Sequence, residues 1–270
     1  MAEVGKIFNR RTFCLITGAS RGLGHHIGKG FAEKFVDHSM IVLVSRDEEG
    51  LAQTKQKIKQ SNTKIDVLIC PQDLSSDNEQ DYDNLFQKII TSNVFLSTKF
   101  EQAMIVHNAG SMGDVSKRVI DFKDPKHIQR YFNINVGSML VLNSKFLDLF
   151  AADKVKHRVC IQLSSLCAIQ AFKSWSLYCS GKAARDMLWS TLAEECPDIR
   201  VLSYAPGPLD TEMQVVARTD SADPDVKNMF IKMHAEKQLV EPSSSVERLI
   251  KILEKDAFKN GQHVDFYDDL

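Results

Sequence analysis

The sequence predicts one α/β domain over residues 1–270, a doubly wound sheet of about seven parallel strands flanked by helices. Two observations predict this class. Short apolar runs alternate with helical patterns along the chain, and most of these runs are rich in Val, Ile and Leu without alternating with polar residues. Such runs are typical of strands buried on both faces of a parallel sheet. Alternating strands and helices build a sheet with crossover helices on its two faces.

The seven predicted strands are apolar runs bounded by turn or cap residues, at 13–19, 40–46, 65–72, 104–110, 158–165, 200–207 and 263–267. The predicted helices lie at 25–36, 47–60, 77–90, 125–150, around Tyr178 and at 241–256. In the first of them, Ile27, Phe31 and Phe35 recur at four-residue spacing, which places them on one helix face. Asp47 is a predicted N-cap with acidic residues in the turn that follows it.

Residues 208–240 form the one region without a clear pattern. It follows the sixth predicted strand at its carboxyl end, where ligands bind in doubly wound sheets. We therefore interpret it either as a substrate loop that closes like a lid, or as a surface insertion.

The composition restricts the class of protein. Charged residues make up 26% of the chain and the net charge is −1, which provides no electrostatic argument for a nucleic acid or an anionic membrane as a partner. No apolar run approaches the roughly 20 residues of a membrane span, and residues 1–11 lack the apolar core of a signal peptide. We expect a cytoplasmic protein.

The cysteines do not predict a metal site. None of the six is part of a C-x-x-C pair, so we expect no zinc. Cys14, Cys70 and Cys160 lie in predicted strands, and we expect them to be small buried thiols.

The turn after the first strand indicates a dinucleotide site. Gly18, Gly22 and Gly24 lie between strand and helix, where glycine lets the backbone turn sharply and approach a pyrophosphate. The helix N-terminus then presents N–H groups to the phosphates.

Arg46 ends the second strand and Arg21 lies in the glycine turn. Two guanidiniums can bind a 2′-phosphate, so we expect NADPH. Asp73, after the third strand, either meets the adenine or caps a turn.

Tyr178 and Lys182 are one helical turn apart and share a face. Ser165 ends the fifth strand, and in a doubly wound fold this strand end and the next helix line the same crevice. Asn135, on the preceding helix, can join them. An ammonium about 4 Å from the phenol supplies about 4 kcal/mol, which would bring a tyrosine pKa of about 10 close to neutral. A solvated helix pair is the alternative.

These segments resemble the short-chain dehydrogenase/reductase family, which has a Rossmann-type fold, over nearly the whole chain. The resemblance rests on "TGASRGLG", "HNAG", Ser165 with "YCSGK", and "PGPLDT". It implies that Tyr178 donates a proton, Ser165 holds the substrate carbonyl, Lys182 binds the nicotinamide ribose and lowers the tyrosine pKa, and Asn135 supports a water. It implies a cofactor site for NADPH/NADP+ made of Gly18, Ser20, Arg21, Gly22, Leu23, Gly24, Arg46, Asp73, Leu74, Asn108, Tyr178, Lys182, Leu209, Thr211, Met213 and Gln214. His107 replaces the asparagine usual in the family, at a position that mainly supports the fourth strand.

A narrower resemblance concerns the pterin-reducing members of that family. It rests on "SSLCAIQAFKSWSLYCSGKAARDM", "YAPGPLDTEMQ" and "GQHVDFYDD". It implies NADPH-dependent reduction of pterin side-chain carbonyls in tetrahydrobiopterin biosynthesis, with Ser165, Tyr178, Gly207 and Asp265 as the substrate site.

Asp265 also has an argument of its own. Strand alternation places His263, Asp265 and Tyr267 on one side and Val264 and Phe266 on the other. A carboxylate can accept two parallel N–H bonds, and a pterin carries such a donor pair. Phe172, Trp175 and Met213 can form apolar walls for the ring, although the two aromatic residues equally fit a core or a dimer surface.

Two other functions remain open. The first is a broad-specificity carbonyl or dicarbonyl reductase, which would have no use for Asp265. The second is a non-catalytic NADPH-sensing protein, which would not need the catalytic set. The resemblance also implies a homodimer formed through long helices such as 125–150.

Overall fold

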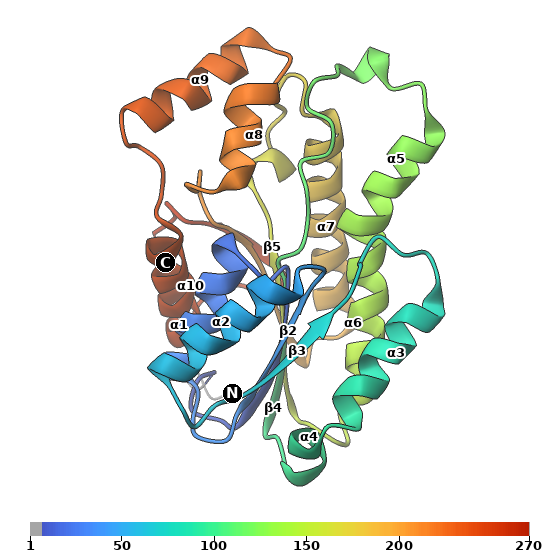
Figure 1. The fold of residues 1–270 in the computed structure, drawn as a ribbon, viewed down its shortest axis with the longest axis vertical. Helices are drawn as coiled ribbons and strands as arrows, with labels where there is room; N and C mark the ends of the chain where they lie inside the picture. Colours follow the sequence, from blue (N-terminus) through green and yellow to red (C-terminus); the bar gives the residue numbers. More distant parts are fainter. Residues whose placement is uncertain (1–6, 270) are drawn as a thin grey trace.

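The computed structural model describes residues 7–269, so part of the N-terminal stretch expected to lack a signal peptide lies outside the described residues. Its sheet has seven strands, all parallel, in the order β3-β2-β1-β4-β5-β6-β7. The strands are β1 Thr12–Thr17, β2 Met40–Ser45, β3 Asp66–Pro71, β4 Gln102–His107, β5 His157–Leu163, β6 Ile199–Ala205 and β7 Gln262–Asp265. This arrangement confirms the predicted fold class (Figure 1).

The helices are α1 Gly22–Lys34, α2 Glu48–Ser61, α3 Glu79–Ile90, α4 Asn93–Ser97, α5 Pro125–Phe132, α6 Ser138–Leu149, α7 Ser176–Glu195, α8 Glu212–Asp220, α9 Pro224–Ala235 and α10 Pro242–Lys255. A π-helical segment, η2 Asn133–Gly137, joins α5 to α6, and two 3-10 turns lie at η1 Val119–Asp121 and η3 Leu166–Ala168. Residues of α1, α2 and α10 pack in one core cluster, and residues of α3, α6 and α7 pack in another. The sheet is therefore covered on both faces.

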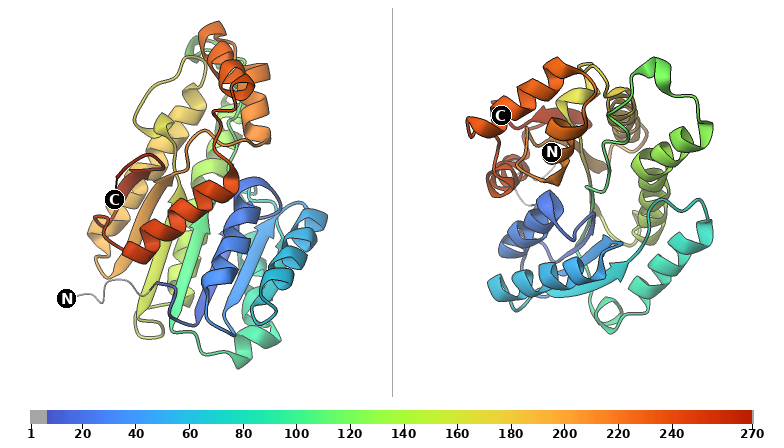
Figure 2. Two further views of the ribbon diagram at one scale, coloured as in Figure 1. Left: turned by 90° about the vertical axis from the view of Figure 1, so that its left-hand side faces the viewer. Right: turned by 45° about the horizontal axis from the view of Figure 1, so that its top comes forward.

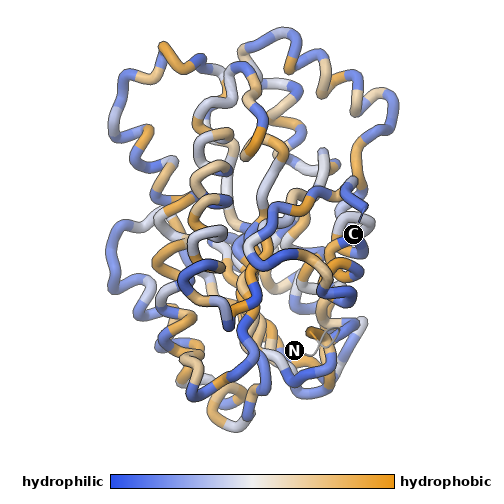
Figure 3. Tube along the Cα trace, turned by 180° about the vertical axis from the view of Figure 1, so that it is seen from behind, coloured by the Kyte–Doolittle hydropathy of each residue, from blue (hydrophilic) through white to orange (hydrophobic). Residues whose placement is uncertain are grey.

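The central strands are largely apolar because both of their faces are buried. In β1, Cys14 and Ile16 belong to the cluster under α1 and α10, whereas Phe13 and Leu15 belong to the cluster under α6. Figure 3 shows hydrophobic residues gathered along the strands and hydrophilic residues along the outer loops. Cys14, Cys70 and Cys160 are buried, as expected.

Three predicted elements differ from the observed ones. The helix expected over 125–150 contains η2, so its hydrogen-bond pattern changes in the middle. The segment 208–240 is largely helical, as α8 and α9, and an irregular region was the wrong expectation. Asp223 caps α9 and Pro224 occupies its first turn. An N-cap residue followed by proline is a helix start signal, and the sequence analysis did not recognise it among the polar residues. The last strand ends at Asp265, two residues earlier than expected.

The helices α8 and α9 lie beyond the carboxyl ends of the strands, at the top of Figure 1 and of the left view in Figure 2. Among residues 7–269, no helix combines the length and the apolar character that crossing a membrane requires.

Candidate active site

A cleft of about 810 Å³ lies along the carboxyl ends of the strands. The sheet order reverses between β1 and β4, and ligands bind at such a switch point in doubly wound folds. The turn between β1 and α1 forms one side of the cleft. Gly18 there has φ +64°, and a side-chain carbon on Gly24 would lie only 2.3 Å from the Gly18 carbonyl oxygen. The turn therefore requires glycine at these two positions.

The N-terminus of α1 faces this cleft through Gly22 and Leu23. Its N-cap residue, Arg21, makes no side-chain capping bond, so the first-turn N–H groups have no capping side chain. Such a helix end is suited to an anion. A dinucleotide pyrophosphate fits this turn, because the glycines leave the backbone without side chains and no side chain caps the first-turn N–H groups of α1.

Two arginines line the adenosine end of the cleft. Arg46 follows β2, and Arg21 forms an ion pair with Glu212 at 2.7 Å, with both side chains largely exposed. An exposed pair of this kind contributes at most about 1 kcal/mol, so Arg21 can exchange Glu212 for a phosphate. Asp47 accepts a bond from the Gly50 N–H and caps α2, which confirms its predicted role.

Asp73 has the turn-capping role that was one of its two interpretations. Its carboxylate accepts a bond from the Ser75 N–H at 2.9 Å, and the residue also lines the cleft. Asn108 lies at the opposite side of the glycine turn. Its amide donates to the carbonyls of Thr17 and Gly18 at 3.0 Å, so it holds the turn in place.

The structure brings together most of the expected cofactor residues. The cleft is lined by Gly18, Ser20, Arg21, Gly22, Leu23, Arg46, Asp73, Leu74, Asn108, Tyr178, Lys182, Leu209, Thr211 and Met213. Gly24 and Gln214 are not in this lining, because Gly24 packs against Gly18 and Gln214 lies in the neighbouring pocket. His26 also lines the cleft and was not expected, since nothing in its local pattern separates it from His25.

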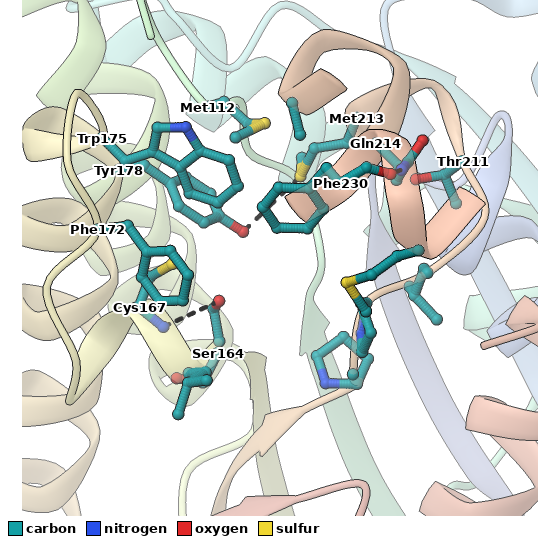
Figure 4. A pocket seen from close by; sticks show the side chains of 18 of the residues that line it. Met112, Ser164, Cys167, Phe172, Trp175, Tyr178, Thr211, Met213, Gln214 and Phe230 are labelled. Carbon is teal, nitrogen blue, oxygen red and sulfur yellow. Dashed lines mark hydrogen bonds between the residues drawn. The ribbon is translucent and has the colours of Figure 1, made fainter. Parts of the chain in front are cut away.

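Tyr178 and Lys182 project from the first turns of α7, and both are buried. The Lys182 Nζ donates to the Leu163 carbonyl at 2.5 Å and lies 5.6 Å from the centre of the tyrosine ring. The tyrosine hydroxyl points toward the Met213 sulfur, at 3.7 Å (Figure 4). The pair is therefore not a solvated helix pair.

The charge states differ from the expectation. Burial raises the pKa of Tyr178, although a hydrogen bond with Ser165 and the charge of Arg185 act to lower it. Burial, followed by the nearby Arg185 charge, lowers the pKa of Lys182 to about 7. The expectation that Lys182 brings the pKa of Tyr178 down toward neutral was therefore wrong in direction. Removing the phenol from water raises its pKa more than the nearby charges lower it.

Arg185 is a buried residue that the sequence analysis missed. Its guanidinium donates to the carbonyls of His107, Ala109 and Asn135 and to the side chain of Gln162, at 2.5 to 3.1 Å. Arg185 therefore links three elements to α7: the end of β4, the η2 segment and β5. Its spacing of three residues from Lys182 is the one local signal that could have indicated it.

Asn135 lies in η2, and π-helical segments occur often at functional sites. Its side-chain amide accepts a hydrogen bond from the Ser111 N–H and donates one to the Tyr131 carbonyl. Asn135 lines neither the cleft nor the pocket that adjoins it. His107 is also buried, with its ring edge-on to Trp189 at 5.0 Å. Burial lowers its pKa to about 3, so it is a neutral support for β4.

A second pocket of about 510 Å³ adjoins the cleft at Tyr178. The Trp175 ring stacks on Phe172, with centroids 5.5 Å apart, and on Phe230, with centroids 5.0 Å apart, and the three rings are labelled in Figure 4. Because Phe230 belongs to α9, the segment 208–240 forms a wall of this pocket. Met112, Met213, Met229 and Met233 add further apolar surface.

The four expected substrate residues, Ser165, Tyr178, Gly207 and Asp265, all line this pocket. Tyr178 also lines the cleft, and Ser164, the residue before Ser165, lines both the cleft and the pocket. One Asp265 oxygen accepts a bond from the Tyr267 N–H at 3.1 Å. A carboxylate has further acceptor positions, so Asp265 can still bind a donor pair.

The chain matches the family model for short chain dehydrogenase over residues 12–222. It is 40% identical to sepiapterin reductase from Xenopus tropicalis over 268 residues, which covers 99% of this chain and 100% of the relative. It is 37% identical to sepiapterin reductase from Bos taurus over 270 residues, covering 99% of each chain. Among solved structures, the crystal structure of the KRED1-Pglu enzyme superimposes with a TM-score of 0.78 at 27% identity, covering 94% of this chain and all of the other.

Proposed function

The chain belongs to the short-chain dehydrogenase family, and from this premise we propose that it reduces side-chain carbonyls of a pterin with NADPH. The family membership confirms the resemblance found in the sequence motifs, and the chain is accordingly an oxidoreductase that uses a nicotinamide cofactor. The substrates that we propose are sepiapterin and 6-pyruvoyl-tetrahydropterin, in tetrahydrobiopterin biosynthesis.

One observation carries the proposal. A single pocket is lined by Ser165 and Tyr178 near the cleft and also by Asp265, with a stacked aromatic wall at its side. A pterin has a flat ring, a donor pair at one end and a carbonyl-bearing side chain at the other. A planar ring packs well against flat aromatic faces, and the donor pair is complementary to a carboxylate.

The chain's residues have separate tasks in this reaction. Bound NADPH supplies a hydride to the carbonyl carbon. Ser165 donates a hydrogen bond to the carbonyl oxygen, where negative charge develops. Tyr178 then supplies the proton, and its raised pKa keeps the phenol protonated at neutral pH, as a proton donor must be. The Arg185 charge favours the ionised tyrosine that remains after proton transfer, and Lys182 lines the cleft together with Tyr178. Leu209, Thr211 and Met213 border both the cleft and the pocket.

We favour NADPH over NADH because Arg46 and Arg21 line the same end of the cleft. We also propose a cytoplasmic homodimer. Leu140 on α6 and Met187 on α7 are exposed apolar side chains on the two long helices through which family members associate. Light scattering after size exclusion measures the number of subunits, and a monomer would contradict this part of the proposal.

The experiment is to mix the protein with sepiapterin and either NADPH or NADH, and to follow cofactor absorbance at matched concentrations. We expect rapid oxidation of NADPH and much slower oxidation of NADH. No turnover of sepiapterin, alongside turnover of a simple diketone, would reject the pterin assignment.

The second candidate is a broad-specificity carbonyl reductase. The observation in its favour is the largely apolar pocket wall of Phe172, Trp175, Phe230 and the methionines, which can accept many hydrophobic ketones. The two candidates differ in Asp265, because a simple diketone offers it no donor pair. A non-catalytic NADPH sensor is disfavoured, since Ser165 and Tyr178 line one pocket and Tyr178 also lines the cleft.

A further inference from the structure

Two cysteines from different elements lie in one side-chain cluster with Tyr178. Cys167 lies in η3 and Cys179 in the first turn of α7, and the two pack in one small cluster with Trp175 and Tyr178. Each thiol shifts the pKa of the other, upward for Cys167 and downward for Cys179. Cys167 is 5% exposed and lines the substrate pocket, whereas Cys179 is half-buried.

The surroundings of the two sulfur atoms differ. The Cys179 sulfur lies 3.9 Å from the Gln170 carbonyl. Interaction with the Cys167 thiol, followed by the backbone N–H groups of Phe172 and Cys179, lowers the pKa of Cys179 below that of a free thiol. The same interaction between the thiols, together with burial, raises the pKa of Cys167. One partner is therefore suited to act as a nucleophile and the other as a resolving thiol.

We propose that Cys167 and Cys179 are a peroxide-sensitive thiol pair, which closes to a disulfide beside the substrate pocket and lowers turnover. The Cys179 thiolate attacks one oxygen of hydrogen peroxide, the O–O bond breaks, and a sulfenic acid and hydroxide form. The Cys167 sulfur then attacks the Cys179 sulfur, an S–S bond forms, and the sulfenic oxygen leaves as water. In total, two thiols and one peroxide give one disulfide and two waters. A dithiol such as dithiothreitol reverses the change.

The reason for the loss of turnover is geometric. Ser165 is the N-cap of η3, and its hydroxyl accepts a bond from the Cys167 N–H at 3.2 Å. Tyr178 is the residue before Cys179 on α7. An S–S bond of about 2.0 Å requires the two elements to move together, and a misplacement of about 1 Å at a reacting group can lower a rate about a hundredfold. We expect turnover to fall about ten- to a hundredfold.

The other cysteines provide controls. Cys14, Cys70 and Cys160 are buried in the sheet, and burial raises the pKa of each thiol. Cys196 is half-buried like Cys179 but lies at the far end of α7, as its C-cap. Cys196→Ser is therefore the matched control for Cys179→Ser.

The test treats the reduced full-length protein with hydrogen peroxide and maps disulfides by mass spectrometry of unreduced tryptic peptides. Trypsin cleaves after Lys173, between the two cysteines, so a disulfide joins two separate peptides. Met229 on α9, 39% exposed and away from the proposed dimer helices, reports by its sulfoxide that the peroxide has acted. We expect the joined peptides in the wild type and in Cys196→Ser, and not in Cys179→Ser or Cys167→Ser.

Activity is expressed for each variant as the ratio after and before treatment, so that a change in basal turnover does not matter. We expect this ratio to fall in the wild type and in Cys196→Ser, to recover with dithiothreitol, and to stay near one in Cys179→Ser. Met229 sulfoxide without the joined peptides would overturn the proposal, as would an equal loss of activity in Cys179→Ser. The peptide measurement needs no turnover, so a wrong substrate assignment would not be mistaken for failure of the thiol pair.

Discussion

Replacing Lys182 by methionine should stabilise the protein at neutral pH while removing most of its activity. Lys182 is buried, and burial together with Arg185 lowers its pKa from the ordinary 10.5 to about 7. Between these pH values the unfolded chain binds more protons at this residue than the folded chain does. The contribution of Lys182 to the free energy of unfolding is therefore most unfavourable below pH 7, and it becomes less unfavourable as the pH rises toward 10.5.

The size of the effect follows from these two pKa values. Holding Lys182 in the folded state costs about 4 kcal/mol at pH 7 and about 1 kcal/mol at pH 9.5. Methionine removes this cost, but it leaves the Leu163 carbonyl without its donor, which costs about 1–3 kcal/mol at either pH. We expect Lys182→Met to be more stable than the wild type by about 1–3 kcal/mol at pH 7. The advantage should shrink by about 3 kcal/mol at pH 9.5.

The assay is urea unfolding of both proteins at pH 7 and pH 9.5. The decisive quantity is the change with pH in the stability difference, because the unpaired carbonyl contributes equally at both values. Lys29→Met is the control, because the Lys29 side chain on α1 is about half exposed. Its stability difference from the wild type should not change between the two pH values. A stability difference that is the same at both pH values within about 0.5 kcal/mol would refute the argument that burial lowers the lysine pKa.

Three further substitutions test the roles of individual side chains. Tyr178→Phe should lower turnover about 10²–10⁴-fold with NADPH affinity unchanged in a binding titration, and near-normal turnover would remove this tyrosine as the proton donor. Arg46→Ala should weaken NADPH about ten- to a hundredfold and NADH little, and an equal loss for the two cofactors would place the 2′-phosphate elsewhere. Asp265→Asn replaces an acceptor oxygen by a donor, which should cost about 2–5 kcal/mol. It should therefore lower kcat/KM for sepiapterin at least tenfold and leave a small diketone unaffected, whereas a parallel fall for both substrates would make Asp265 structural.

The parts of the site that could be predicted are those with short-range signals. Gly18 and Gly24 stand where the backbone turns from strand to helix, and the turn excludes any side chain there. Tyr178 and Lys182 share a helix face because four residues make about one turn. The strand order places the ends of β1, β4 and β5 on one edge of the sheet, so the glycine turn and Ser164 reach the same cleft from distant parts of the chain, and Ser165 lines the adjoining pocket.

The amino-acid sequence by itself determined the parallel sheet, the glycine turn and the residue types at the reacting end, because periodicity and spacing are local properties of the chain. Only the tertiary structure decided the burial of Arg185, the direction of the pKa changes at Tyr178 and Lys182, and the packing of Cys167 and Cys179 in one cluster. It also decided that Phe230 of α9 stacks on Trp175 and makes the segment 208–240 a pocket wall. The physical reason is that desolvation and contacts between distant elements depend on what packs around a side chain, and no local pattern specifies those neighbours.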